Sequence, residues 1–336
     1  MTALPHFLAE KLKRDKLKCV DVGARGGLQG SWARFRDFIE TDALEPDPVA
    51  CARERNAARR GEHWFPIGLA GTSGKHSLHV LGKPSGSSLY PPNPPVIGEF
   101  ATESYRRLDK VVEIDALSFS DFIREEARPL PNLIKFDTQG SELDILRSLQ
   151  DEHWADLLAV QTEIEFVELY KGQHLFADVD LFMKSKGFIL YDLLPVRSYR
   201  SGGDETHYYL KKHLGIGRNR RDISCRLIAG DALYLRPLPE ILAKCDLSLF
   251  SKSFLSLLIY RCLDEALWLL ETGQQQGLLS RNDLEAAISF IRAIAPRPSL
   301  RQRTDAVGKW ARKIYRWVGV GQAKKAEYWL DRKWDY

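Results

Sequence analysis

The sequence predicts an α/β fold in which helices cover both faces of a mostly parallel sheet, followed by a helical C-terminal extension. Three observations support this fold class. Short apolar runs alternate with amphipathic stretches through roughly the first 200 residues, as repeated strand–helix units require. A glycine-rich turn at residues 23–27 follows the first of these runs. Beyond Pro239, Leu and Phe recur at intervals of three and four residues, which is the spacing of one helix face.

Each element follows from its local pattern. Strands are expected at Lys18–Val22, Ala43–Glu45, Trp64–Leu69, Leu133–Asp137, Ala159–Phe166 and Phe188–Leu193. Helices are expected between most of them, at Trp32–Ile39, Pro48–Arg60, Ser141–Leu149 and Ala177–Lys186. Alternation over residues 76–80 predicts a small hairpin, and residues 231–236 have the pattern of a last strand. The Gly-, Pro- and Ser-rich segment 82–98 is interpreted as a lid over a site, with a plain linker as the alternative.

These patterns divide the chain into three parts. An N-terminal helix is expected over residues 1–17, the sheet domain over residues 18–238 and the helical extension over residues 239–336. The extension is expected to pack on the sheet domain or on a second copy of the chain, which would make a homo-oligomer.

Composition excludes several classes of protein. The 336 residues are 44% hydrophobic and 28% charged, with a net charge of +4, which is too small a basic bias to indicate a nucleic-acid partner. The apolar runs are too short for a membrane span, and the N-terminus has no signal-peptide core. The five cysteines form no C-x-x-C pair. A reduced, cytoplasmic protein is therefore expected.

The last 28 residues, 309–336, mix Trp and Tyr with Lys and Arg. Such a segment can make peripheral contact with a membrane surface or bind a polyanion. It can equally be a terminal helix whose aromatic residues dock on the body of the protein.

The first strand and the turn after it indicate a nucleoside site. Asp21 lies between two valines, and Gly23, Gly26 and Gly27 then let the backbone approach a ligand closely. Glu45, at the end of the next strand, is spaced to accept hydrogen bonds from ribose hydroxyls. The turn lacks the G-x-G-x-x-G run that seats a pyrophosphate, which argues against an oxidoreductase using a dinucleotide. A nucleoside without phosphates, such as S-adenosylmethionine, fits this difference.

The most specific segment runs from Asn132 to Glu142. A buried strand places Lys135 and Asp137 on one side of the sheet, and Gly140 then turns the chain into a helix. Glu163 and Glu165 share a face of the following strand. With Asp137 they could bind sugar hydroxyls or a divalent cation, although paired acids can also be solvated or neutralised by Lys135 or an arginine.

These motifs together resemble the FkbM-type S-adenosylmethionine-dependent methyltransferases over roughly residues 18–195. The resemblance rests on Val20–Gly27, Glu45-Pro46-Asp47, Ser85–Leu89, Ile134–Glu142 and Glu163–Gln173. It implies a Rossmann-like class I methyltransferase sheet, with an antiparallel last strand. One departure is that Leu117-Ser118 stands where the family usually has a Leu-Asp pair.

The resemblance implies transfer of a methyl group from S-adenosylmethionine to a hydroxyl, in many members of the family a hydroxyl of a sugar or a polyketide. A sugar or glycan precursor is the expected acceptor. The catalytic candidates are Asp137, as base or as the group that orients one, with Glu163 and Lys135. The cofactor candidates are Asp21, Gly23, Ala24, Gly27, Glu45, Pro46, Gly68 and Leu69.

The acceptor candidates are Ser88, Glu165 and His207, while His76 and His79 are weaker candidates for a base. No set of metal ligands is identified, so a divalent metal is possible without support from the sequence. The alternative to an enzyme is a catalytically degenerate methyltransferase fold that serves as a scaffold through its basic, aromatic tail.

Overall fold

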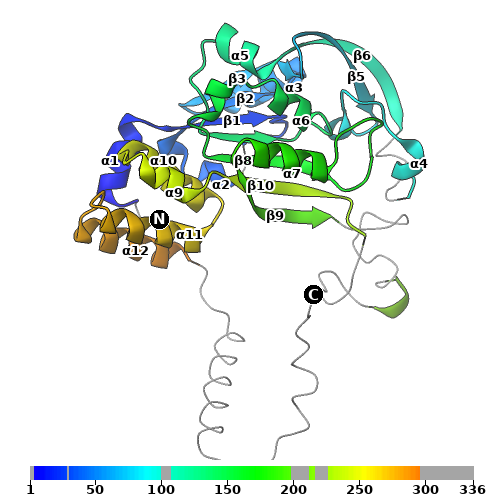
Figure 1. Ribbon diagram of the computed structural model, residues 1–336. Helices are drawn as coiled ribbons and strands as arrows, with labels where there is room; N and C mark the ends of the chain where they lie inside the picture. The colour runs from blue at the N-terminus through cyan, green and yellow to red at the C-terminus, as the bar shows by residue number, and fades with distance from the viewer. Residues whose placement is uncertain (1–3, 29, 100–106, 198–211, 216–225, 296–336) are drawn as a thin grey trace, which may run out of the picture. The chain divides into compact units, whose positions relative to one another are not determined.

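The computed structural model describes residues 4–28, 30–99, 107–197, 212–215 and 226–295. The described residues up to Phe290 belong to a first compact unit. The first unit contains a seven-stranded sheet of order β3-β2-β1-β7-β8-β10-β9 (Figure 1). Its strands are β1 (Leu17–Val22), β2 (Ile39–Leu44), β3 (Glu62–Phe65), β7 (Leu133–Phe136), β8 (Ala159–Glu165), β9 (Ile189–Arg197) and β10 (Ala229–Leu235). In this sheet β3, β2, β1, β7 and β8 are parallel, and β10 is antiparallel to both of its neighbours, β8 and β9. The predicted fold class is confirmed.

Strand β1 is the point at which the strand order reverses. Its register pairs Asp21 with Ala43 of β2 on one side and with Lys135 of β7 on the other. The chain leaves β1 toward one half of the sheet and later returns to the other half. The loops after β1, β2 and β7 therefore diverge at one edge, where doubly wound sheets bind their ligands.

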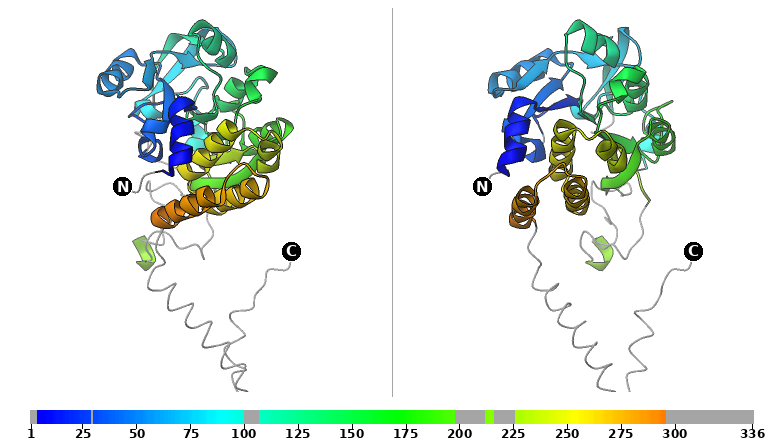
Figure 2. Two further views of the ribbon diagram at one scale, coloured as in Figure 1. Left: turned by 90° about the vertical axis from the view of Figure 1, so that its left-hand side faces the viewer. Right: turned by 60° about the vertical axis from the view of Figure 1, so that its left-hand side comes forward.

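One face of the sheet is apolar. Its strand residues pack against α5 (Phe119–Glu125), α6 (Glu142–Arg147) and α7 (Phe176–Ser185) in one buried cluster (Figure 2). The members of this cluster from the strands are Val20, Val22, Leu44, Ile134, Phe136, Val160, Ile164, Ala232 and Tyr234. These residues alternate along each strand, as a half-buried pattern requires.

The opposite face is mixed in character. Helix α3 (Pro48–Ala57) covers its β2–β3 end through Cys51, which packs with Ala43 and Trp64. Helix α10 (Leu247–Ile259) ends against β1, where burial together with the nearby Cys19 and Asp21 raises the pKa of the Tyr260 hydroxyl. This face therefore holds polar groups under its covering helices.

A second, three-stranded sheet of order β4-β6-β5 was only partly predicted. It contains β4 (Gly68–Leu69), β5 (Gly74–Leu81) and β6 (Leu108–Leu117). The expected strand 64–69 is divided between the two sheets, because Pro66 has no N–H to continue the ladder. The small hairpin expected at residues 76–80 is wrong, because these residues lie within the single strand β5, which pairs antiparallel with β6. No strand was expected at the position of β6.

The helix expected at Trp32–Ile39 is also wrong. A short α2 (Gly30–Ala33) and a 3-10 turn (Arg36–Phe38) occupy this region, and β2 already begins at Ile39. Trp32 and Phe35 are buried, which gave the segment its apolar spacing. The β-branched Ile39 and Thr41 pair with β1 instead of continuing a helix.

Helices flank the sheet domain in sequence, as expected. Helix α1 (His6–Arg14) precedes β1, and α9 (Leu238–Ala243), α10, α11 (Leu263–Gln275) and α12 (Arg281–Ile294) follow β10. Helices α1, α9, α10 and α11 belong to the same compact unit as the sheet. In the part of the chain that the structure describes, no helix has the length and apolar character needed to cross a membrane.

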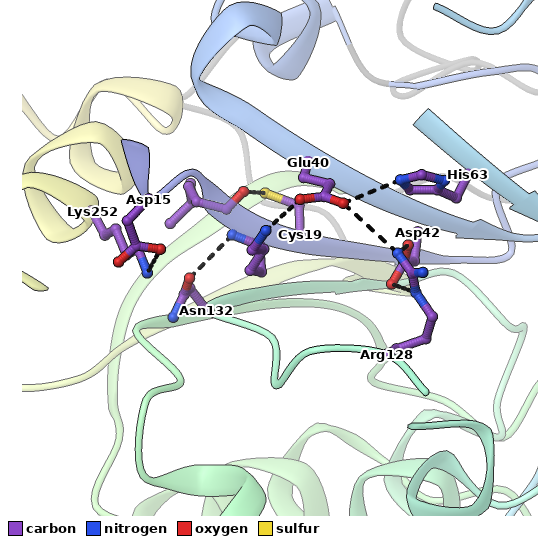
Figure 3. A network of polar contacts seen from close by, with 10 residues as sticks. Asp15, Cys19, Glu40, Asp42, His63, Arg128, Asn132 and Lys252 are labelled. Carbon is purple, nitrogen blue, oxygen red and sulfur yellow. Dashed lines mark hydrogen bonds and ion pairs between the residues drawn. The ribbon is translucent and has the colours of Figure 1, made fainter. Parts of the chain in front are cut away.

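A polar network ties together the amino ends of the central strands (Figure 3). Glu40 binds both Lys18 and His63, and the Lys18 backbone N–H donates to the Asn132 side chain at 3.1 Å. Arg128 donates two hydrogen bonds, of 2.6 and 2.9 Å, to the buried Asp42. At this end of the sheet the charged side chains fix strand positions.

Candidate active site

A cavity of about 800 Å³ lies at the carboxyl ends of β1, β2 and β7. Its floor is formed by the loops that follow these strands, and its far wall is formed by β5 and β6. This volume is within the range that holds a drug-sized ligand. The site is therefore built from segments that are far apart in the sequence.

The glycine turn after β1 is closed tightly against the loop after β7. Gly23 has a φ of +81°, and its N–H donates to the Leu44 carbonyl at 3.0 Å. A Cβ at this position would lie 2.1 Å from the carbonyl oxygen of Asp137, so a side chain cannot be accommodated without moving that loop. The glycine thus sets how closely Asp137 approaches the first loop.

Glu45 is positioned at the end of β2 with its carboxylate buried. Its Oε1 accepts the Asp47 N–H at 3.0 Å and lies 3.3 Å from the Arg25 guanidinium. Arg25 also binds Asp47 at 2.7 Å, while Asp47 caps α3 through the N–H groups of Val49 and Ala50. These contacts hold the predicted ribose acceptor rigidly at the cavity floor, where Arg25, Glu45 and Asp47 are all lining residues.

Asp137 directly follows β7, and its side chain is exposed at the cavity. Its Oδ1 accepts a hydrogen bond of 2.9 Å from the Gln139 side-chain amide, which also donates to Glu163. Gln139 has a φ of +59°, so the backbone turns sharply to aim this amide back at both carboxylates. Asp137 is thereby oriented while remaining accessible.

The serine-rich segment is clamped to this loop. The Ser88 hydroxyl is buried and donates to the Gln139 carbonyl at 2.6 Å. The Tyr170 Oη lies 2.7 Å from the Gly86 carbonyl and 3.1 Å from the Gln139 Oε1. Burial, with Glu163 and Glu165 close by, raises the pKa of the Tyr170 hydroxyl, so it stays a neutral donor. Segment 86–88 and loop 137–140 therefore form one structural unit.

Glu142 shapes the loop from below. Its carboxylate oxygens accept the N–H groups of Thr138 at 2.7 Å and of Gly140 at 2.8 Å. Burial raises the pKa of this carboxyl to about 7, against the opposing effect of these donors. Glu142 therefore holds the backbone of loop 137–140 through these two hydrogen bonds. Its place in the first turn of a predicted helix does not reveal this role.

Lys135 and Asp21 form a buried ion pair of 3.0 Å across β1 and β7, and neither lines the cavity. Burial raises the pKa of Asp21, although Lys135 opposes this, and the neighbouring acids Asp21 and Asp137 hold the pKa of Lys135 above its usual value despite burial. The pair joins two strands directly beneath the cavity. This contact supports a positioning role, and a direct catalytic role for Lys135 stays a prediction.

The structure brings together about half of the predicted site residues. Those that line the cavity are Gly23, Glu45, Pro46, Gly68, Leu69 and Asp137. Those that do not line it are Asp21, Ala24, Gly27, Ser88, Lys135, Glu163 and Glu165. His207 and the tail at residues 309–336 lie outside the described residues.

Three contributors were not assigned roles from the sequence: Arg25, Gln139 and Tyr170. Gln139 and Tyr170 stand inside the motifs that the sequence analysis singled out, so the signal was present without a stated role. Arg25 lies in the glycine turn, where a cation two residues after Gly23 could have been paired with Glu45. Within the described ranges, no group of three or more His, Cys, Asp or Glu side chains is arranged to hold a metal ion.

Comparison with known proteins agrees with this arrangement. The family model for the methyltransferase FkbM domain matches residues 21–190, half of the chain. A protein named Methyltransferase 1 from the fungus Beauveria bassiana is 40% identical over 78 residues, which are 23% of this chain and 29% of that relative.

Among solved structures, a crystal structure of the SAM-dependent methyltransferase from Agrobacterium tumefaciens is similar at a TM-score of 0.32 and 12% identity. That match covers 69% of this chain and 60% of the other, and it is too weak to add to the assignment. The family assignment follows from the domain match, which spans the glycine turn, Glu45 and the Asp137 loop. The chain belongs to the FkbM methyltransferase family.

Proposed function

We propose that this protein is an S-adenosylmethionine-dependent O-methyltransferase whose acceptor is a hydroxyl of a sugar or glycan precursor. The observation that carries the proposal is the position of Asp137. Its carboxylate is exposed in the same cavity as the glycine turn and Glu45, and it is oriented by Gln139. An acid held in this way beside a nucleoside site is suited to take a proton from an acceptor hydroxyl.

The lining residues fit S-adenosylmethionine. Glu45 offers a carboxylate to a ribose diol, and Pro46, Gly68 and Leu69 offer a small apolar surface beside it. The turn at residues 23–27 brings backbone close to the cavity without a phosphate-binding helix start. When bound, this cofactor supplies a methyl group on a positively charged sulfonium, which is electrophilic without further activation.

The protein's own groups then have to align the acceptor and remove its proton. Asp137 accepts this proton, and the Gln139 amide keeps the carboxylate pointed at the cavity. Glu163 shares the same amide, so the two carboxylates lie close together. Beside the Asp137 carboxylate, Ser85, Ser87 and Thr138 line the cavity with hydroxyl oxygens. Several acceptor oxygens in one cavity favour a polyhydroxylated ligand, because each hydroxyl of a sugar can donate to one of them.

Binding of S-adenosylhomocysteine tests the cofactor part of the proposal. We expect saturable binding by isothermal titration calorimetry at micromolar ligand. Glu45→Gln should weaken this binding by roughly five-fold, because a hydrogen bond to a neutral acceptor contributes about 1 kcal/mol less than one to a carboxylate. Glu113→Gln, an exposed acid on β6 outside the cavity lining, is the matched control. No saturable binding by the wild type would remove the enzyme proposal.

The acceptor class is tested by turnover. Nucleotide sugars and glycan fragments should be screened with labelled S-adenosylmethionine, with and without magnesium or manganese. Methyl transfer to nitrogen or carbon acceptors alone would contradict the O-methyl assignment.

The alternative of a degenerate scaffold predicts a different pair of results. A scaffold would show no methyl transfer with any acceptor in the screen. Its partner binding would also be unchanged by Asp137→Ala.

A further inference from the structure

The wall of the cavity opposite the glycine turn has its own chemistry. On the β5–β6 ribbon, Leu78 pairs with Val112 and Val80 pairs with Lys110, so these side chains share one face. All four line the cavity, and the three apolar ones are only half-buried. The face is apolar along its length and ends in a cation.

The ribbon reaches well beyond the cofactor end of the cavity. Its near end touches that end, since a Cβ on Gly68 would lie 3.2 Å from Ile114 Cδ1 and 3.4 Å from Pro46 Cβ. Lys110 is four residues from Ile114 along β6, a distance of roughly 13 Å at the usual rise per residue of a strand. The far half of this wall is therefore available to a second ligand.

That far half carries two cations. Arg107 and Lys110 both line the cavity, and neither has an ion-pair partner among the described residues. Asp109 also lines this end, so one net positive charge remains there. By contrast Lys75, on the same ribbon but outside the cavity lining, is bound by Asp115 at 2.8 Å. The cations facing the cavity are thus the ones left for a ligand.

The far wall also connects to the reacting end. Ser85, Ser87 and Leu89 line the cavity between the ribbon and loop 137–140. The clamp of Ser88 on Gln139 fixes this segment next to Asp137. A molecule with its hydroxyl at Asp137 can therefore extend along Leu89 and Val80 toward Arg107.

We propose that the far half of the cavity is an acceptor subsite for an apolar group that ends in an anion, a phosphate or a carboxylate. Leu78, Val80 and Val112 contact the apolar group, and Arg107 with Lys110 binds the anion. The inference rests on the proposed methyltransferase function and adds the class of acceptor to it. It selects glycosides or sugar carriers with an acidic apolar moiety over free neutral sugars.

Two fluorescent probes with the same ring system test the subsite without knowledge of the acceptor. Anilinonaphthalene sulfonate carries an anion, and N-phenylnaphthylamine lacks it. Both are titrated into the full chain saturated with S-adenosylhomocysteine, and we expect the sulfonate to bind more tightly. Arg107→Ala with Lys110→Ala should lower sulfonate affinity roughly five-fold and leave the neutral probe unchanged, as two solvent-exposed charge contacts allow.

Three further variants test the anion site, the control cation and the apolar wall in turn. Asp109→Asn should raise sulfonate affinity, because it removes the one opposing charge at this end. Lys75→Gln removes a ribbon cation outside the lining and should leave both probes unchanged. Val112→Ser should weaken both probes, since it removes apolar contact area.

Competition distinguishes the two sources of the anion. Geranyl phosphate, geranic acid and geraniol share an apolar chain and differ in the end group. Displacement of the sulfonate by the phosphate alone assigns a phosphorylated carrier, and displacement by both acids assigns a general anion site. Equal displacement by geraniol would overturn the role of the cations.

Failure of this inference is separable from failure of the proposed function. If S-adenosylhomocysteine does not bind the wild type, the methyltransferase proposal fails first. If it binds but also displaces the sulfonate, or if the Arg107 and Lys110 changes weaken S-adenosylhomocysteine itself, the wall belongs to the cofactor. Either result overturns the acceptor subsite.

Discussion

The two ends of the central sheet use the same kinds of residue for different purposes. At the amino ends, Glu40 and Asp42 are held by Lys18, His63 and Arg128 (Figure 3). At the carboxyl ends, Asp137 is exposed to a cavity, and its contact with Gln139 orients it without neutralising its charge. Asp137 differs from Glu40 and Asp42 because the side-chain amide of Gln139 holds it, and no salt bridge to it forms among the described residues.

The backbone conformation also differs between the two ends of the sheet. The amino ends meet in regular strand pairing, with Asn132 tying β7 to Lys18. At the carboxyl ends, Gly23 has a φ of +81° and packs against the backbone of Asp137, and Gln139, two residues after Asp137, has a φ of +59°. Gln139 is a non-glycine residue in the left-handed region, and contacts from Ser88, Tyr170 and Glu142 to loop 137–140 hold this conformation.

The largest expected effect separates chemistry from stability. Asp137→Asn should lower turnover by about 10²- to 10⁴-fold, the contribution of a positioned base. Affinity for S-adenosylhomocysteine should stay within about two-fold, because an exposed side chain is changed without loss of volume. Turnover is measured with labelled cofactor and binding by calorimetry. Unchanged turnover would show that another group removes the proton.

A change at the amino ends of the strands should lower stability and leave turnover unchanged. Arg128→Ala leaves the buried Asp42 carboxylate without its cation, which costs about 3 kcal/mol of unfolding free energy. Turnover per folded molecule should be preserved. The control is Arg124→Ala, whose exposed ion pairs should contribute less than about 1 kcal/mol. Equal urea midpoints for the two variants would contradict this account of the amino end.

Glu142→Ala tests the support beneath the loop. The change leaves the N–H groups of Thr138 and Gly140 without their acceptor and should lower the free energy of unfolding by about 2 kcal/mol. The folded pKa of about 7 lies above the usual value of 4.5, so the folded state binds the extra proton between these values. The stability of the wild type should therefore fall, relative to the variant, as pH rises from about 5 to about 8. Thermal unfolding at both pH values measures this difference, and a rise would contradict the direction of the pKa shift.

The smallest effect concerns the clamp. Tyr170→Phe removes the hydroxyl that lies between Gly86 and Gln139, at a cost of about 1 kcal/mol. Turnover should fall by a few-fold while S-adenosylhomocysteine affinity is kept, because the clamp orients Gln139 and does not line the cavity. Tyr191→Phe, on β9 outside this cavity, provides the control. A loss of cofactor affinity instead would show that the clamp shapes the cofactor cradle.

Much of the fold could be predicted because its signals are local. Buried parallel strands such as β1, β7 and β8 are short apolar runs, and the turn after β1 needs glycines that are visible in any sequence. Strand β6 was not identified, since its residues 108–117 mix charges with apolar side chains and its partner β5 is separated by a long segment. Trp32 and Phe35 suggested a helix because apolar spacing does not reveal which surface buries a side chain.

For the candidate active site, the sequence by itself singled out the glycine turn, Glu45 and Asp137, because each is a short motif at the end of a strand. Only the tertiary structure decided which acids are neutralised. The pairing of Lys135 with Asp21, and the hold of Gln139 on both Asp137 and Glu163, depend on strand register and on a loop conformation fixed by distant residues. Strand register brings together residues such as Asp21 and Lys135, which are 114 positions apart in the sequence. The free energy of such a contact depends on tertiary packing, so a local sequence pattern does not reveal it.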